Sequence, residues 1–271
     1  MQIGNREFDL QNRAYIMGIL NVTPDSFSDG GKWSNIDVAL NHVEDMIENG
    51  ASIIDIGGES TKPGYIPISE DEEIERVTAY IKKIKENFDI PISIDTYKAE
   101  VARAAIETGA NLINDIWGFK ADKKMAQVAA KEKIPCCIMH NRTNNQLPYT
   151  SLMQNILDDL QGSIDIGLKA GLGLEMMITD PGIGFAKTLE ENLCVMNEIE
   201  LLHRLGCPIL LGTSRKSMIG LSLELPVEER LEGTLATTTI GVMKGCSIIR
   251  VHDVKENYRV LRMTEKILGR G

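Results

Sequence analysis

The sequence lacks a long apolar run, a cysteine framework and an excess of basic residues. No apolar run approaches membrane-spanning length, and the N-terminal segment lacks the apolar stretch of a signal peptide, so we expect a cytoplasmic protein outside the membrane. The five cysteines form no CxxC pair, which argues against a disulfide scaffold or a zinc site and favours buried reduced thiols. A net charge of −10 argues against nucleic acid or an anionic membrane as a partner.

Short runs rich in isoleucine, valine and leucine recur along the chain, with amphipathic segments between them. Such runs are typical of parallel strands that are buried on both faces. They begin at Tyr15, Ser52, Pro91, Leu112, Pro135, Met176, Pro208 and Ser247. Eight strand–helix units in about 250 residues predict a (β/α)8 TIM barrel, with a doubly wound open sheet as the alternative. No linker composition interrupts the pattern, so we expect residues 1–271 to form a single domain.

Two of the intervening segments show a helical pattern clearly. The first spans residues 37–49 and is expected to end at Gly50. Its apolar face consists of Val38, Ala39, Val43, Met46 and Ile47. In the next unit Ser69 and Glu72 have the spacing of a capping box. The stripe behind that box consists of Ile74, Val77, Ile81 and Ile84.

The apolar runs end in polar side chains, and in a TIM barrel the carboxyl ends of the strands form the active site. These side chains are Asn21, Glu59, Asp95, Asn114, Asp115, His140, Asp180, Ser214, Arg250 and His252. Any one of them could be an ordinary turn former. Asp55, Asp95 and Asn114, however, lie within apolar runs, where a carboxylate needs a partner. His140 could be a base or a metal ligand, although a hydrogen-bonded structural imidazole is the interpretation we favour.

The chemistry of these groups indicates a ligand with a guanidine-like edge and an anionic part. Asp95, Asn114 and Asp180 can accept hydrogen bonds from a ring that carries an amino group and a ring N–H. Four cations follow the second, seventh and eighth runs, namely Lys62, Arg215, Lys216 and Arg250. Ser214 and Arg215 also lead into a predicted helix, whose free N–H groups favour an anion. The sequence contains neither a Walker A loop nor a GxGxxG motif between strand and helix, which argues against a nucleoside triphosphate or a dinucleotide.

Seven ordered motifs resemble the dihydropteroate synthase family over nearly the whole chain. They are GILNVTPDSFSDGG, GGESTKPG, SIDTYKAEVA, LINDIWG, TDPGIGFAKT, GTSRKS and RVHDV. The resemblance implies a TIM barrel, usually a homodimer, that joins 6-hydroxymethyl-7,8-dihydropterin diphosphate to p-aminobenzoate and releases diphosphate with the help of Mg²⁺. It also implies that sulfonamides inhibit the enzyme.

The resemblance assigns roles to individual residues. The pterin residues are Asp95, Asn114, Asp180, Lys216 and Arg250, of which all but Asn114 are also expected to be catalytic. The diphosphate residues are Asn21, Lys62, Arg250 and His252, and Asn21 is the expected Mg²⁺ ligand. The p-aminobenzoate pocket matches Thr61, Pro63, Phe185 and Ser214. The mobile first loop, residues 23–31, carries Asp25 and Phe27.

Two departures from the family pattern concern the second loop and the segment after His140. Lys62 stands where arginine is common, which keeps the charge but loses the bidentate fork. The segment NRTNNQLPYTSLMQNIL also differs from the usual run, and we assign it no role.

The expected mechanism is dissociative, with diphosphate loss ahead of attack by the arylamine, because the motifs contain no nucleophile–base pair. One alternative is a pterin-binding methyltransferase that acts with a corrinoid protein, which would not need the cations of SRKS and RVHD. A second alternative is a catalytically silent pterin-binding protein, which the retention of Asn21, Arg250 and His252 disfavours.

Overall fold

The computed structural model describes residues 1–23, 32–59, 66–143 and 148–270. Eight parallel strands run side by side in the order β8-β7-β6-β5-β4-β3-β10-β9, and a bridge between Thr179 and Ile209 joins the two ends of the sheet. The strands are β3 (Tyr15–Asn21), β4 (Ala51–Gly57), β5 (Ile92–Asp95), β6 (Leu112–Asp115), β7 (Cys136–Met139), β8 (Met177–Asp180), β9 (Leu210–Leu211) and β10 (Ile248–Val251). Each of the eight expected runs overlaps one of these strands. The barrel is therefore confirmed, and the open sheet is excluded.

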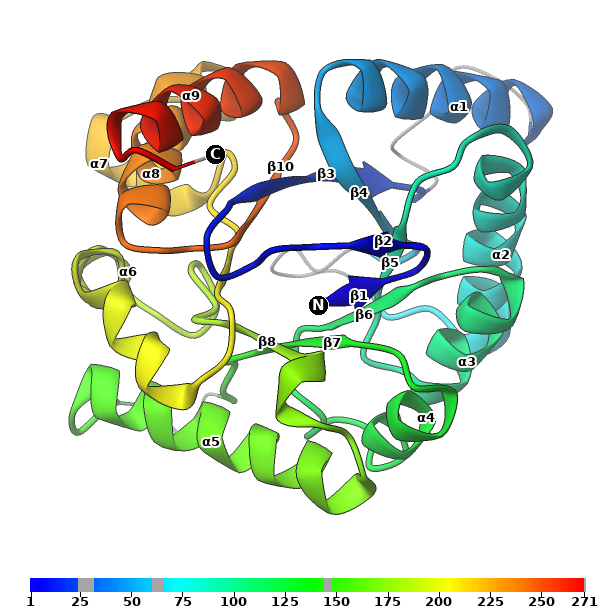
Figure 1. The fold of residues 1–271 in the computed structure, drawn as a ribbon, viewed down its shortest axis with the longest axis horizontal. Helices are drawn as coiled ribbons and strands as arrows, with labels where there is room; N and C mark the ends of the chain where they lie inside the picture. Colours follow the sequence, from blue (N-terminus) through cyan, green and yellow to red (C-terminus); the bar gives the residue numbers. More distant parts are fainter. Residues whose placement is uncertain (24–31, 60–65, 144–147, 271) are drawn as a thin grey trace.

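A ring of helices surrounds the strands in chain order (Figure 1). The helices are α1 (Lys32–Glu48), α2 (Glu70–Asn87), α3 (Ala99–Thr108), α4 (Met125–Glu132), α5 (Leu152–Ala170), α6 (Leu189–Glu198), α7 (Ser217–Leu223), α8 (Leu231–Met243) and α9 (Val254–Ile267). Short 3-10 turns lie at Leu174–Met176, Ile199–Leu205 and Val227–Glu229. Across the described ranges, no helix combines the length and the apolar character needed to cross a bilayer.

The strands bury both of their faces, as parallel strands do. One set of side chains packs against the helices and includes Ile54, Ile56, Ile92 and Ile94. The alternating set points into the barrel and forms a second cluster. Its strand members are Met17, Ile53, Leu112, Cys137, Ile178, Leu210 and Ile248. The apolar side chains of this inner cluster lie toward the starts of the strands, which leaves the carboxyl half of the interior to polar residues.

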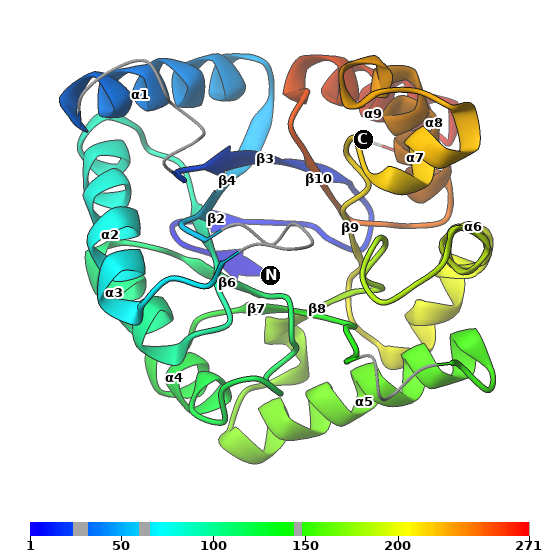
Figure 2. The ribbon, with the colours of Figure 1, turned by 180° about the vertical axis from the view of Figure 1, so that it is seen from behind.

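An N-terminal hairpin that the sequence analysis did not predict covers the start of the barrel. Strands β1 (Gln2–Ile3) and β2 (Arg6–Glu7) pair antiparallel across Gly4 and Asn5, with Gly4 at a φ of 61°. Gly-Asn between short strands is a recognised hairpin signal. Ile3, Phe8 and the nearby Leu10 join the inner cluster. Figure 1 looks onto this hairpin, and Figure 2 shows it behind the barrel.

Two details of the predicted helices are wrong. Helix α1 begins at Lys32 instead of Asp37, and Val38 is 52% exposed. Val38 lies about 100° around the helix from its buried neighbour Ala39, which turns it away from the core.

The predicted capping box of α2 is only half formed: Ser69 Oγ accepts from the Glu72 N–H, but the Glu72 carboxylate bonds Arg76 instead. The predicted stripe of α2 is confirmed, with Val77, Ile81 and Ile84 buried and Ile74 partly buried.

Candidate active site at the carboxyl ends of the strands

Arg250 lies at the centre of the polar half of the barrel. It extends from β10 and donates from Nε to Asp55 Oδ2 and from Nη2 to Asp95 Oδ2, each at 2.6 Å. Asn114 from β6 also donates to Asp55 Oδ2, at 3.3 Å. Arg250 and Asn114 therefore meet at Asp55, and Asp95 joins them through Arg250. The sequence analysis named Asp55 as a buried polar group but gave it no role. A polar residue inside an apolar run was the signal for it.

Asp180 and Lys216 form the other side of the same site. Asp180 is 7% exposed, and its Oδ1 accepts from the Gly182 N–H at 2.7 Å. Gly212 lies beside both groups: a Cβ at this position would be in ordinary van der Waals contact with the Arg250 Cβ at 3.9 Å and with Asp180 Oδ2 at 4.0 Å. Lys216 Nζ donates to the Ile183 carbonyl and lies 4.8 Å from the centre of the Phe185 ring. Phe185 is half-buried.

The site holds charges of both signs away from water, and their pKa values reflect this. Burial raises the pKa of Asp95, and Arg250 only partly offsets the effect because it is shared with Asp55. Burial also raises the pKa of Asp180, against the opposing charge of Lys216. For Lys216, burial lowers the pKa to about 8, while Asp180 acts in the opposite direction. Perturbed carboxylates and a perturbed lysine in one place are typical of a functional site.

Ser214 and His252 lie together beside this group. Ser214 Oγ is 2.9 Å from His252 Nδ1 and accepts from the His252 backbone N–H at 3.1 Å. Their neighbour Arg215 donates from Nε to Asp253 Oδ2 at 2.9 Å. Asp253 thus neutralises Arg215, and Asp55 and Asp95 neutralise Arg250. Among the described members of the expected cationic group, this leaves Lys216 as the one without a carboxylate in hydrogen-bond contact.

Asn21 ends β3 beside Gly57 and is exposed. Its Oδ1 would lie 3.7 Å from a Cβ at Gly57, and Asp95 Oδ2 would lie 3.8 Å from the same point. Asn21 is therefore next to the Asp95 carboxylate of the site. In the described ranges, no group of three or more His, Cys, Asp or Glu side chains could hold a metal ion.

The expected residues of the first two loops lie outside the described residues; they are Asp25, Phe27, Thr61, Lys62 and Pro63. The flanks of the second loop are described, and a buried ion cluster connects them. Lys98 Nζ donates to Glu59 Oε2 at 2.8 Å, to Glu73 Oε2 at 2.7 Å and to the Ile68 carbonyl at 2.8 Å. Glu59 also accepts from the Ile68 N–H at 2.9 Å. Residues 59 and 68 are thereby joined on the two sides of the loop.

Two other strand-end residues have structural roles. Asp115 accepts from the N–H groups of Trp117 and Phe119 at 2.9 and 2.7 Å and so holds the turn after β6. His140 is completely buried, with Nδ1 2.9 Å from Lys187 Nζ and Nε2 3.2 Å from Asp159 Oδ2. The contact with Asp159 has the distance of an ion pair without the alignment of a hydrogen bond. The structural interpretation of His140 is confirmed.

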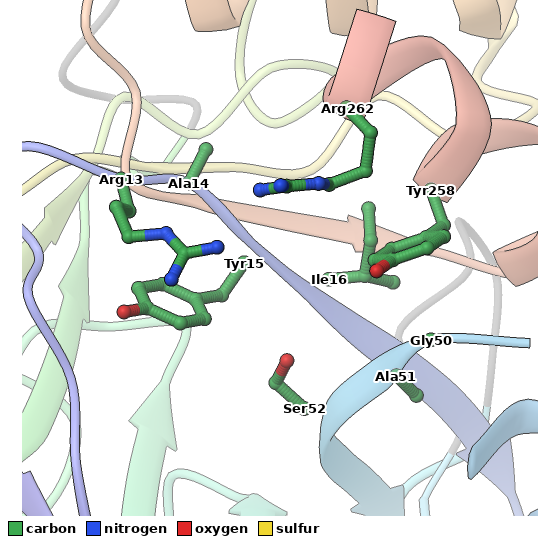
Figure 3. Close-up of a pocket in the computed structure, with 9 residues that line it drawn as sticks. All are labelled: Arg13, Ala14, Tyr15, Ile16, Gly50, Ala51, Ser52, Tyr258 and Arg262. Atoms are coloured by element: carbon green, nitrogen blue, oxygen red, sulfur yellow. The ribbon is translucent and has the colours of Figure 1, made fainter. Parts of the chain in front are cut away.

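A separate cavity of about 260 Å³ lies at the opposite end of the barrel (Figure 3). Its walls include Arg13, Gly50 and Tyr258, near the starts of β3 and β4. Arg262, which also lines it, is already paired with Glu265 at 2.6 Å. Since TIM-barrel chemistry takes place at the carboxyl ends of the strands, we assign this cavity no part in catalysis.

Comparison with known proteins identifies the kind of site. The sequence pattern of the family described as pterin binding enzymes matches residues 17–252. A dihydropteroate synthase of Clostridium beijerinckii is 64% identical over 271 residues, which is 100% of both chains. A dihydropteroate synthase structure from Clostridium difficile with pteroic acid has a TM-score of 0.93 and 50% identity, and the match covers 96% of this chain and 99% of that one. The Yersinia pestis enzyme in a sulfonamide drug complex has a TM-score of 0.92 and 40% identity, with 99% of each chain covered.

The buried state of His140 predicts how stability depends on pH. Burial lowers the pKa of His140 to about 4 from a reference of 6.5, although Asp159 opposes the shift. Between these values the unfolded chain binds the proton and the folded chain does not. The free energy of unfolding should therefore fall as the pH drops from 6.5 to 4, by up to about 3 kcal/mol.

Urea unfolding of the wild type and of His140→Gln across this pH range checks the prediction. The free energy of unfolding should decline more steeply for the wild type, because the variant has no imidazole to titrate. Parallel curves for the two proteins would show that His140 does not carry the effect.

Proposed function

The chain belongs to the pterin-binding enzymes and, within them, to the dihydropteroate synthases, and from that membership we propose how its own residues carry the reaction. The substrates are 6-hydroxymethyl-7,8-dihydropterin diphosphate and p-aminobenzoate. The C–O bond to the diphosphate breaks and its electron pair leaves with the diphosphate. The amine nitrogen forms the new C–N bond to the pterin methylene and loses its proton to solvent.

One observation carries this assignment: Asp95, Asn114 and Asp180 gather around Arg250 inside the barrel mouth. The edge of a pterin offers an amino group and ring N–H donors, which match carboxylate and amide oxygens. Lys216 lies between Asp180 and Phe185 and can donate to a ring acceptor after leaving the Ile183 carbonyl. We therefore assign the pterin to the centre of this group.

The same group suits a dissociative reaction. Positive charge that develops on the pterin methylene spreads into a ring held by Asp95 and Asp180, and ionised carboxylates stabilise it. Arg250 and His252 are proposed to contact the leaving diphosphate. Lys62, outside the described residues, is proposed as a secondary diphosphate contact. No protein nucleophile is needed, so positioning supplies most of the catalysis.

The p-aminobenzoate is proposed to bind against Phe185 and Ser214, with Thr61 and Pro63 from the second loop. Ser214 is 7% exposed and Phe185 is half-buried, so together they present a polar and an apolar surface near Lys216. Sulfonamides, one of which is bound to the Yersinia pestis enzyme, would compete for this pocket.

The residues at the end of β3 fit a Mg²⁺ ion that is bound chiefly through the substrate. Mg²⁺ commonly takes one or two protein ligands and completes its shell with phosphate oxygens and water. Asn21 offers an exposed amide oxygen beside the site and would be that ligand. When bound, the ion would neutralise negative charge on the leaving diphosphate.

Two further features belong to this proposal. We propose a homodimer through the apolar face of α6, α7 and α8, whose exposed side chains are Leu193, Leu221, Leu223, Ile240 and Met243. Exposed apolar side chains on neighbouring helices are typical of a protein interface. We also propose that the enzyme works in the reducing cytoplasm, in keeping with its five free cysteines.

The reaction itself is tested by incubating the enzyme with the pterin diphosphate, p-aminobenzoate and Mg²⁺. We expect dihydropteroate and diphosphate in equal amounts, loss of turnover when EDTA replaces Mg²⁺, and competition between a sulfonamide and p-aminobenzoate. Binding of the pterin without product would instead support the catalytically silent alternative.

The pterin assignment is tested by Asp95→Asn and Asp180→Asn. Each change removes a charge-assisted hydrogen bond, so pterin affinity should fall by about 10-fold to 100-fold, with turnover reduced as well. Calorimetry and steady-state kinetics measure the two effects. Asp165→Asn, an exposed change on α5, is the control and should alter neither. Near-normal turnover and affinity in either site variant would remove that residue from the site.

The dimer is tested by light scattering on the wild type and on the double variant Leu221→Asp with Ile240→Asp. We expect a dimer that dissociates in the variant, because the new charges would be buried at the interface. Leu168→Asp, which is similarly exposed on α5, should remain dimeric. A wild-type monomer at all concentrations would contradict the proposal.

A further inference from the structure

Lys187 lies inside the turn that follows β8, where its ammonium group has three acceptors. Nζ donates to the Gly182 carbonyl at 2.9 Å and to the Phe185 carbonyl at 3.1 Å, and it lies 2.9 Å from His140 Nδ1. A protonated lysine has three N–H donors and no acceptor. All three donors are thus used, two of them on the backbone of one turn.

The third acceptor connects this turn to the body of the barrel. Because an ammonium group faces His140 Nδ1, the ring proton belongs on Nε2, which points toward Asp159 of α5. Asp159 is itself held by Arg142 Nε at 2.6 Å. The chain of contacts from α5 through His140 therefore ends at Lys187 and fixes where its ammonium group lies.

The turn needs such support because its backbone is unusual. Gly182, Gly184 and Ala186 have φ values of 69°, 82° and 48°. Ala186 has a side chain, and a left-handed conformation is costly for such a residue unless its surroundings hold it. A Cβ at Gly182 would lie 2.0 Å from the His140 carbonyl oxygen, which shows how closely the turn packs on β7.

The turn after β8 presents three groups to the active site, and Lys187 bonds to none of these three groups directly. The Ile183 carbonyl accepts from Lys216 Nζ, and the Phe185 ring lies beneath that nitrogen. The Gly182 N–H holds Asp180. The two carbonyls bound by Lys187 belong to Gly182 and Phe185, on either side of Ile183.

We propose that Lys187 is a positioning residue that sets the Phe185 ring and the Ile183 carbonyl for p-aminobenzoate binding. This inference rests on the proposed function, because it uses the assignment of Phe185 to the p-aminobenzoate pocket. Lys187 itself touches neither substrate. Its effect on p-aminobenzoate should therefore exceed its effect on the pterin, whose principal contacts come from the strands.

The charge of Lys187 depends on its surroundings. Burial lowers its pKa to about 7, while the carboxylates of Asp180 and Glu191 act to raise it and the cations Lys216 and Arg142 act to lower it further. Assays at a pH of about 6 keep the ammonium form, which is the form that fills all three contacts.

The test compares Lys187→Met, Lys187→Arg and the matched control Lys120→Met. Methionine has an unbranched side chain of similar length to lysine but has neither a positive charge nor N–H donors. Arginine keeps the positive charge and the N–H donors. Lys120 donates to the Asp159 carbonyl at 2.8 Å and so contacts the same segment of α5 without reaching the turn. Thermal unfolding is recorded for every protein.

We expect Lys187→Met to raise the KM for p-aminobenzoate by about 10-fold to 100-fold and to change the Kd for the pterin diphosphate by less than about threefold. Lys187→Arg should recover most of the loss, and Lys120→Met should behave as the wild type. An equal change for both substrates, or none for p-aminobenzoate, overturns the inference.

Two further outcomes are distinguishable. If Lys187→Met does not fold, Lys187→Arg decides alone. Its KM for p-aminobenzoate must stay within about threefold of the wild type. A larger rise in this KM, with an equal rise in the Kd for the pterin diphosphate, contradicts the proposal. If the wild type forms no dihydropteroate, the proposed function fails, and the inference that rests on it fails for that separate reason.

Discussion

The pairing of Arg250 with Asp55 and Asp95 is the interaction on which the rest of the site depends. A carboxylate as deeply buried as Asp55, at 0% exposure, would be very costly without a cation beside it. That cation comes from β10, the last strand of the chain, which pairs with β3 and so lies one strand away from β4. The barrel therefore brings Arg250 to its carboxylates, and Arg250 in turn makes it possible to bury those carboxylates inside the barrel.

This arrangement also explains why the site can serve a substrate with a hydrogen-bond-donating edge and an anionic diphosphate. Three carboxylates, from Asp55, Asp95 and Asp180, face two cations, Arg250 and Lys216. The raised pKa values of Asp95 and Asp180 show that their negative charge is only partly compensated. A pterin edge that donates several N–H bonds would complete that compensation, while a diphosphate would draw Arg250 toward its own side.

The sequence predicted the eight strands and the polar residues that end them because each depends on a local pattern. It could not predict which polar groups pair, since Arg215 is neutralised by Asp253 and Arg250 by Asp55, contacts between residues far apart in the sequence that only the packed barrel brings together. Val38 was misplaced because an apolar residue at the margin of a helical face can be exposed at little cost. Lys187 was missed because a lysine after a glycine-rich turn resembles a solvated side chain, and its acceptors are His140, directly after β7, and the turn itself.

Lys187 supports a turn because strands and turns of the barrel are held in place by different interactions. Hydrogen bonds between strands already fix the groups assigned to the pterin, as Gly57 with Asp95 and Asp95 with Asn114 in the strand register illustrate. A turn has no such ladder, so its backbone must be held by side chains. Lys98 joins the flanks of the second loop and Lys187 braces the turn after β8. Lys98 binds one carbonyl oxygen and two carboxylates, whereas Lys187 binds two carbonyl oxygens. Each ammonium group thus holds backbone outside the strands, beside a segment that we assign to p-aminobenzoate.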